Sequence, residues 1–127
     1  MLGSKTSLGR ARGLGSARCG TEQLWRQRLT AILGLPLTVA FILIVLSVLG
    51  VDHATAAARL GNPPVAIVLL LTIVNTCVHM RLGMQVIIED YVHATPAKTG
   101  LLMANTGFTA ALGIAGAFAV LEISFGN

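Results

Sequence analysis

Three long apolar runs dominate the hydrophobic pattern of the chain. They cover residues 29–51, 65–88 and 101–121, and the first and third contain no charged residue. A helix needs about 20 residues to cross the ~30 Å hydrocarbon core of a bilayer, so each run is long enough to span it. The two-residue alternation of membrane β-strands is missing from these runs. The pattern therefore predicts an all-α membrane protein with three transmembrane helices, at about 29–51, 65–90 and 101–123.

Prolines and glycines divide this pattern into elements. Residues 52–64 form a connection that ends in a Pro-Pro pair, which suits the start of a helix. Residues 89–100 form a second short connection, in which Pro96 and Gly100 are expected to break the helix. Pro36 lies inside the first apolar run and predicts a bend there.

The composition excludes several classes of protein. Hydrophobic residues make up 54% of the chain and charged residues only 11%, whereas a soluble domain carries about 25% charged residues. These values exclude a water-soluble globule and a disordered chain. The net charge is +4, but it is concentrated at one end of the chain rather than spread over a face that could bind nucleic acid.

The charge distribution predicts the orientation in the membrane. Residues 1–28 hold six of the nine basic residues and one acid, and the rest of the chain is nearly neutral. Because Lys and Arg near a span are retained on the cytoplasmic side, the N-terminus should be cytoplasmic and the C-terminus periplasmic. We therefore divide the chain into a basic cytoplasmic segment, 1–28, and a three-helix anchor domain, 29–127.

The N-terminal segment and the two cysteines bear on the cellular compartment of the chain. A cleaved secretory signal is disfavoured, because the first apolar run of 23 residues exceeds the usual ~7–15 residues. The bacterial inner membrane is predicted, and the mitochondrial inner membrane stays an alternative because the first twenty residues resemble a mitochondrial transit peptide. Cys19 and Cys77 lie at different depths in any membrane arrangement, and they indicate neither a disulfide nor a metal site.

The second span contains polar residues that call for an explanation. His79 and Arg81 lie within it, and each costs several kcal/mol in hydrocarbon unless it is paired or functional. On a helix, Gly83 and Asp90 fall within about 40° of His79, whereas Arg81 falls on the opposite face. His79 with Gly83 one turn later suits a haem ligand with room for a flat macrocycle. The alternative is a histidine hydrogen-bonded to a neighbouring helix. Arg81 is expected to meet lipid head groups or a partner chain.

The number of histidines limits a haem site. The chain has three, and His53 lies in the first connection. His79 and His93 share one helix face, so they cannot bind one haem from both sides. A second axial ligand would have to come from another chain.

A second group of polar residues lies at the end of the second span. Asp90 and Tyr91 are expected at the same membrane level as the segment 25–28, which includes Arg28. A guanidinium, a phenol and a carboxylate at this boundary can hydrogen-bond and protonate a quinone head group. The alternative is an interfacial belt, in which Trp and Tyr anchor the helices and Arg reaches the head groups.

The two segments RGLGSARCGTEQLWRQRLTAI (12–32) and HMRLGMQVIIEDYVH (79–93) resemble the small hydrophobic membrane-anchor subunits of alphaproteobacterial succinate dehydrogenases. The resemblance implies that His79 is an axial ligand of a b-type haem, with the other ligand supplied by the companion cytochrome b subunit. It also implies that Tyr91 hydrogen-bonds ubiquinone, that Asp90 lines that site, and that Arg28 lies near the haem propionates and the quinone.

The resemblance further implies a function for the whole chain. It would anchor the flavoprotein and iron–sulfur subunits of succinate:ubiquinone oxidoreductase, without catalytic residues of its own. Two cysteines are too few for an iron–sulfur cluster, so that chemistry belongs to another subunit. The chain departs from many relatives at Gln23, where a histidine is common, which leaves a proton-relay role at this position in doubt. The alternatives are a cofactor-free structural subunit and a di-haem cytochrome b using His79 and His93.

Overall fold

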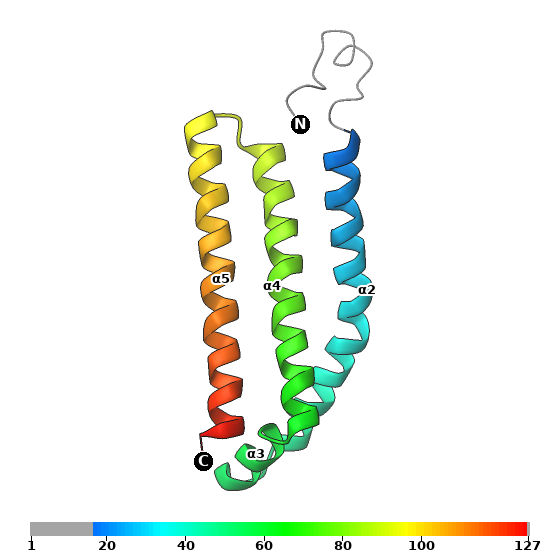
Figure 1. Cartoon of the computed structure of the whole chain (residues 1–127), viewed down its shortest axis with the longest axis vertical. Coiled ribbons are helices and arrows are strands. Elements are labelled where there is room, and N and C mark those ends of the chain that lie inside the picture. The colour runs from blue at the N-terminus through cyan, green and yellow to red at the C-terminus, as the bar shows by residue number, and fades with distance from the viewer. Residues whose placement is uncertain (1–16, 127) are drawn as a thin grey trace.

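The computed structural model describes the backbone of residues 17–126 and the side chains of residues 22–126. It contains four helices in this part of the chain: α2 (Ala17–Val48), α3 (His53–Leu60), α4 (Pro63–Tyr91) and α5 (Thr95–Phe125). The three long helices lie side by side with α4 in the middle, and the short α3 lies across one end (Figure 1). Most of the predicted basic segment falls outside the described residues.

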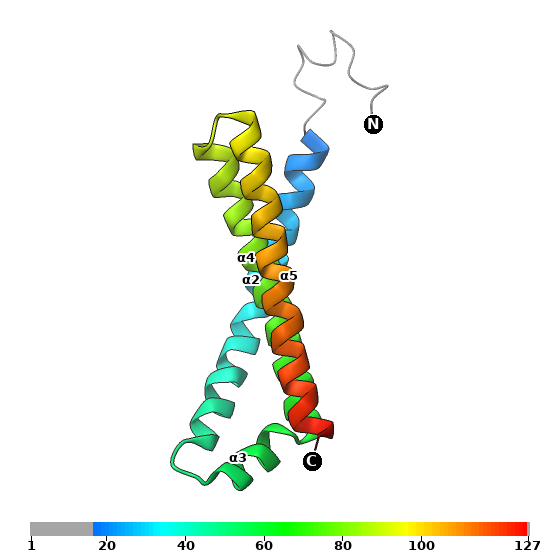
Figure 2. The ribbon, with the colours of Figure 1, turned by 90° about the vertical axis from the view of Figure 1, so that its left-hand side faces the viewer.

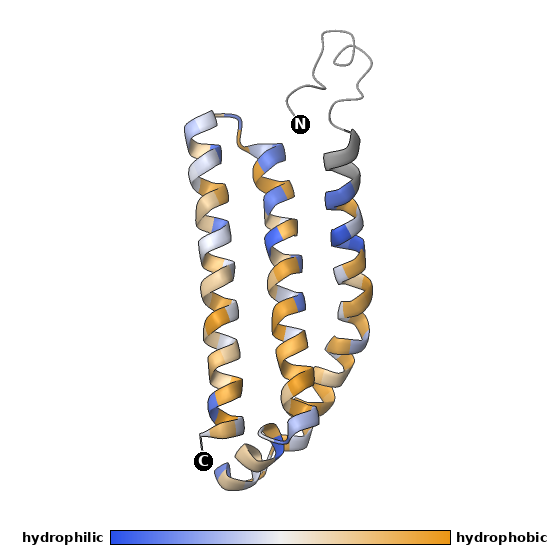
Figure 3. Cartoon of the chain, viewed as in Figure 1, coloured by the Kyte–Doolittle hydropathy of each residue, from blue (hydrophilic) through white to orange (hydrophobic). Residues whose placement is uncertain are grey.

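The prediction of an all-α protein with three membrane-spanning helices is confirmed. Three stretches are long and apolar enough to cross a bilayer: Glu22–Val48, Pro63–Tyr91 and Thr95–Phe125. Apolar residues cover most of their length, and polar residues gather toward the upper ends of α2 and α4 in the view of Figure 3. The orientation of the termini stays a prediction. The helix α2 runs without interruption across the predicted boundary between residues 28 and 29.

Both predicted connections contain more helix than expected. The first, 52–64, includes α3, whose sequence HATAAARL is rich in the best helix-forming residue, alanine. Gly50 has φ 74 in the turn before it, a conformation that favours glycine. The second connection is only residues 92–94, because α5 already begins at Thr95. Pro96 was wrongly expected to break the helix: it lies in the first helical turn, where the missing N–H has no intrahelical partner to lose. Gly100 also lies within α5.

The helix α4 carries most of the packing. Both α2 and α5 pack against it, and in Figure 2 the second half of α2, drawn in cyan, diverges from α4 and α5. This divergence follows Pro36, which lies within α2 as predicted. Small residues bring α5 close to α4, since a Cβ atom added to Gly116 would lie 3.2 Å from the Ile73 side chain.

Few side chains are buried within the chain itself. The buried apolar residues are Ala66, Leu82, Ile88 and Val120, and they all lie on α4 or α5. Large apolar side chains along all three long helices are exposed. In a membrane, such apolar surfaces contact lipid tails or other helices. The polar contacts between α2 and α4 distinguish one face of the bundle from the others.

Candidate functional site

One face of α2 carries polar or small residues toward α4. Gln23, Gln27, Thr30 and Gly34 recur every three or four residues and are all partly buried, whereas the positions between them are exposed. This spacing places them on one side of a helix. The amide Nε2 of Gln23 is buried and has no hydrogen-bond partner among the residues whose side chains the structure describes. The polar face of α2 therefore forms one wall of the candidate site.

His79 meets this wall at Thr30. The Thr30 hydroxyl oxygen lies 3.0 Å from Nδ1 of His79, and 3.0 Å and 2.9 Å from the backbone carbonyl oxygens of Arg26 and Gln27. A hydroxyl has one hydrogen to donate. Because the two carbonyls can only accept, we assign that hydrogen to them, and the Nδ1–H of His79 donates to the hydroxyl oxygen. In this tautomer Nε2 carries the free lone pair.

A second contact fixes the same stretch of α2. The Asn75 amide Nδ2 donates to the backbone oxygen of Thr30 over 2.9 Å. A Cβ atom on Gly34 would lie 3.1 Å from this amide nitrogen, so glycine provides the space for the contact. Neither Thr30 nor Asn75 was among the predicted site residues. Asn75 is a polar residue within an apolar run, one turn before His79. This placement could have identified it as part of the same helix face.

Gly83 lies on the same face of α4, one turn after His79. The nearest side-chain atom to a Cβ added there is Nε2 of Gln27 at 4.0 Å, an ordinary contact distance rather than a clash. The wall therefore leaves space beside Gly83. Nε2 of His79 has no hydrogen-bond partner among the described residues. A histidine with one anchored nitrogen, one free nitrogen and space beside it fits an axial haem ligand.

The hydrogen bonds also fix the register between α2 and α4. Thr30 lies opposite His79 and Gln27 lies beside Gly83, so Arg28 lies opposite Leu82. Tyr91 lies opposite the backbone of residue 19, nine residues or about 14 Å from the level of Arg28. The expectation that Arg28 and Tyr91 share one membrane level is therefore wrong. The reason is that α2 begins at Ala17, twelve residues before the predicted span, so Arg28 lies well inside the helix pair rather than at its end.

The side chains at the predicted quinone end are open to the surroundings. Tyr91 is 78% exposed, and Asp90 and Arg28 are exposed as well. Arg28 is two residues from Thr30, which turns it by about 200° and away from α4. The structure therefore brings His79 and Gly83 together on one face, and it leaves Asp90, Tyr91 and Arg28 to contact groups outside this chain.

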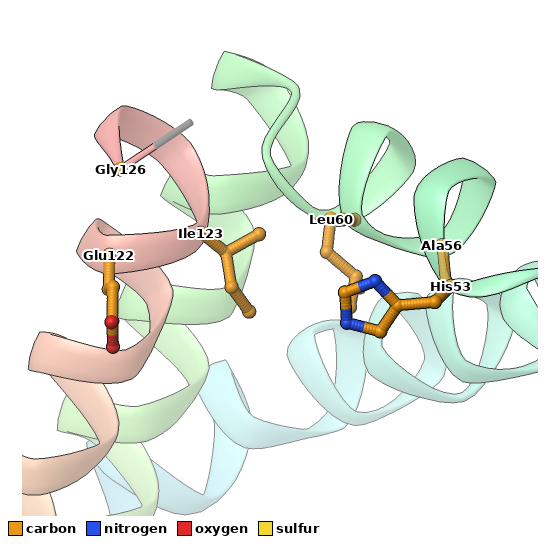
Figure 4. A pocket seen from close by; sticks show the side chains of 7 residues that line it. His53, Ala56, Leu60, Glu122, Ile123 and Gly126 are labelled. Carbon is orange, nitrogen blue, oxygen red and sulfur yellow. The ribbon is translucent and has the colours of Figure 1, made fainter.

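Other candidate ligands lie apart from His79. Among the residues that the structure describes, no group of three His, Cys, Asp or Glu side chains could hold a metal ion. His93 follows the end of α4, and His53 opens α3 at the opposite end of the bundle. His53 and Glu122 line an open pocket of about 330 Å³ between α3 and the end of α5 (Figure 4). This pocket is mainly apolar and is separate from His79.

Comparisons with known proteins identify the family of the chain. Residues 3–116 match the family described as "Succinate dehydrogenase/Fumarate reductase transmembrane subunit". The succinate dehydrogenase hydrophobic membrane anchor subunit of Paracoccus denitrificans is 29% identical over 92 residues, which are 72% of this chain and 71% of that protein. The subunit of the same name from Rickettsia bellii (strain RML369-C) is 30% identical over 95 residues, 75% of this chain and 76% of that protein. No solved structure matches the chain. With three membrane-spanning helices and a match over most of its length, the chain belongs to the succinate dehydrogenase/fumarate reductase transmembrane subunit family, as a multi-pass protein of the bacterial inner membrane.

Proposed function

We propose that the chain is the membrane-anchor subunit of a succinate:ubiquinone oxidoreductase and that it holds a haem b through His79. The observation that carries the haem proposal is the hydrogen bonding of the two nitrogens of the His79 imidazole. Its Nδ1 is anchored on Thr30, and its Nε2 has no partner among the described residues. A histidine that merely packs in a helix interface would gain by using both nitrogens. The alternative is a cofactor-free structural subunit.

The proposed site needs a second chain. A b-type haem would supply one-electron transfer, and His79 would hold it together with a second histidine. His93 and His53 lie too far along the fold to supply the second one. We assign this ligand to the companion cytochrome b subunit. Within this chain, Thr30 orients the imidazole and Gly83 leaves space beside it.

The register separates the two roles that Arg28 was expected to combine. Arg28 lies at the level of Leu82, close to that of His79, and about 14 Å from that of Tyr91. We therefore keep for Arg28 only a role near the haem propionates, as a cation that balances their charge. Because its side chain turns away from α4, the propionates would meet it at the side of α2. We assign Tyr91 and Asp90 to the ubiquinone site at the end of α4. The phenol would donate a hydrogen bond to a quinone carbonyl, and the carboxylate would line the same site, on the side from which protons are supplied.

The other proposed subunits are a flavoprotein and an iron–sulfur protein, which would supply the flavin and iron–sulfur chemistry of the complex. Relatives are named as membrane anchors of succinate dehydrogenase, so we propose that the flavoprotein and iron–sulfur subunits bind at the end where α2 begins. Protons for quinone reduction would enter from the same side. The chain itself supplies position and electrostatics rather than a reacting group.

Purification of the complex through a tag on this chain tests the proposed function. We expect succinate-dependent ubiquinone reduction in the purified material, and a b-type α-band in its dithionite-reduced-minus-oxidised spectrum. Activity without the band would leave the anchor role and remove the haem. Material that contains neither flavoprotein nor iron–sulfur subunit would contradict the anchor role as well.

The contact between Thr30 and His79 leads to a separate prediction. Thr30→Val keeps the shape of the side chain but removes the hydroxyl, so we expect haem affinity to fall about 10- to 100-fold, as for other partners of metal-bound histidines. The haem-to-flavin ratio and the haem midpoint potential of the purified complex measure this. Thr30→Ser retains the hydroxyl and should behave like the parent. An unchanged ratio and potential in Thr30→Val would show that the hydroxyl does not position the ligand.

A further inference from the structure

Arg81 is a charged residue within a membrane-spanning helix that the proposed haem and quinone sites do not use. It lies ten residues before the end of α4, about 15 Å along the helix from Tyr91. If α4 is centred in a hydrocarbon core of ~30 Å, Arg81 lies several ångströms inside that core. It is two residues from His79 and therefore on the opposite face of α4. The side chain is exposed.

The contacts within the chain satisfy this side chain only in part. Nε of Arg81 donates to the Thr106 hydroxyl of α5 over 3.3 Å, and the Asn105 amide donates to the Arg81 backbone oxygen over 3.0 Å. The two NH₂ groups have no partner among the described side chains. The nearest acid on α4, Glu89, is eight residues away and about 80° around the helix, and it accepts from Gln85 over 3.0 Å. The positive charge of Arg81 is therefore unmatched within the described part of the chain.

The geometry disfavours a lipid phosphate as the missing anion. The closer membrane boundary lies toward the C-terminal end of α4, whereas Cα–Cβ bonds in a helix tilt toward its N-terminus. The side chain would have to turn back to reach the head groups. Its contact with Thr106 instead holds the guanidinium near its own depth, because Arg81 and Thr106 are opposite each other in the antiparallel pair α4–α5.

The surface beside Arg81 has room for another helix. Thr106 also lines a shallow groove of about 520 Å³ on α5, together with Thr99, Leu102, Met103 and Gly107. A Cβ atom on Gly107 would have no atom within 4 Å. Small residues allow helices to approach closely in membranes. An anchored cation thus borders an open surface inside the membrane. Because the proposed haem site lies on the opposite face of α4, a fixed negative charge on this face would come from another protein helix.

From this juxtaposition we infer that the surface formed by Arg81, Thr106 and Gly107 is the docking site for a transmembrane helix of another subunit, and that this helix carries a carboxylate paired with Arg81. The inference rests on the proposed function, since the partner belongs to the same complex. The docking surface lies on the side of α4 away from His79, so it is distinct from the proposed haem site.

Substitution of Arg81 distinguishes a paired arginine from one that faces lipid, because the two cases predict opposite changes in the yield of intact complex. In the proposed pairing, Arg81→Leu leaves a carboxylate unpaired within the membrane, and we expect the yield of intact complex to fall about tenfold or more. The measurement is the amount of complex that co-purifies with the tagged chain, relative to the amount of that chain in the membrane. Arg81→Lys should retain most of the yield. Met84→Leu, at a nearby exposed position of α4, is the matched control.

The opposite result would overturn the inference. An arginine that faces lipid destabilises the span, so Arg81→Leu would then give an equal or higher yield and an equal or more heat-stable complex. Suppressor selection gives a second test. Restored assembly of Arg81→Leu should come from neutral replacements of an acidic residue in a transmembrane helix of another subunit, because they remove the unpaired charge. Suppressors confined to this chain would contradict the pairing. Failure of the parent chain to co-purify with any such subunit would instead contradict the proposed function.

Discussion

Replacing His79 with alanine should remove the b-type α-band from an otherwise assembled complex. The imidazole is held on Thr30 through Nδ1. Alanine removes both the proposed ligand atom Nε2 and the hydrogen bond to Thr30. Losing an axial ligand should reduce bound haem to less than about a tenth of the parent value, because even the outer partners of such ligands contribute 10- to 100-fold. The measurement is a dithionite-reduced-minus-oxidised spectrum of membranes in which assembly has been confirmed by the content of the other subunits.

His93→Ala is the matched control for this experiment. His93 was expected on the helix face of His79, but α4 ends at Tyr91 and His93 follows it. Because His93 is also exposed, its removal should leave the band unchanged. Loss of half the haem in each variant would instead support the di-haem alternative. An unchanged band in assembled His79→Ala would remove the ligand assignment and leave an anchoring role, with the histidine serving as a hydrogen-bonded packing residue.

Replacing Tyr91 with phenylalanine should slow ubiquinone reduction without slowing succinate oxidation. The substitution keeps the ring at an exposed position and removes only the phenolic O–H, which we propose donates to a quinone carbonyl. A hydrogen bond of this kind contributes about 1 to 1.5 kcal/mol, so we expect roughly a tenfold loss of ubiquinone reduction. Reduction of an artificial dye by succinate, which does not need the quinone site, should remain close to the parent value.

The ratio of these two activities identifies the role of the phenol. An equal loss of both would mean that Tyr91 supports assembly rather than the quinone site. Full ubiquinone reduction in Tyr91→Phe would place the quinone elsewhere. Phe125→Leu, another exposed aromatic position at the opposite end of the bundle, is the matched control and should change neither activity.

The sequence predicted the candidate ligand but not its surroundings. His79 was identifiable because an imidazole in an apolar run is costly unless it has a role. Its partner Thr30 lies 49 residues away, and no local pattern relates positions on two helices. The same limitation explains the error over Arg28 and Tyr91. Distances along one helix follow from its rise per residue, whereas the level of one helix against another depends on contacts such as that between Asn75 and Thr30.

The sequence by itself determined the three membrane-spanning helices. Their length matches the thickness of the hydrocarbon core, and a helix satisfies its backbone hydrogen bonds where no water is present. It did not determine the ends of the helices, because Pro96 is compatible both with a break and with a first turn. Only the tertiary structure decided which faces meet. It placed His79 against Thr30 on one side of α4 and Arg81 beside Thr106 on the other. Those choices arise from close packing at Gly34 and Gly116, where side chains from distant parts of the chain must fit together.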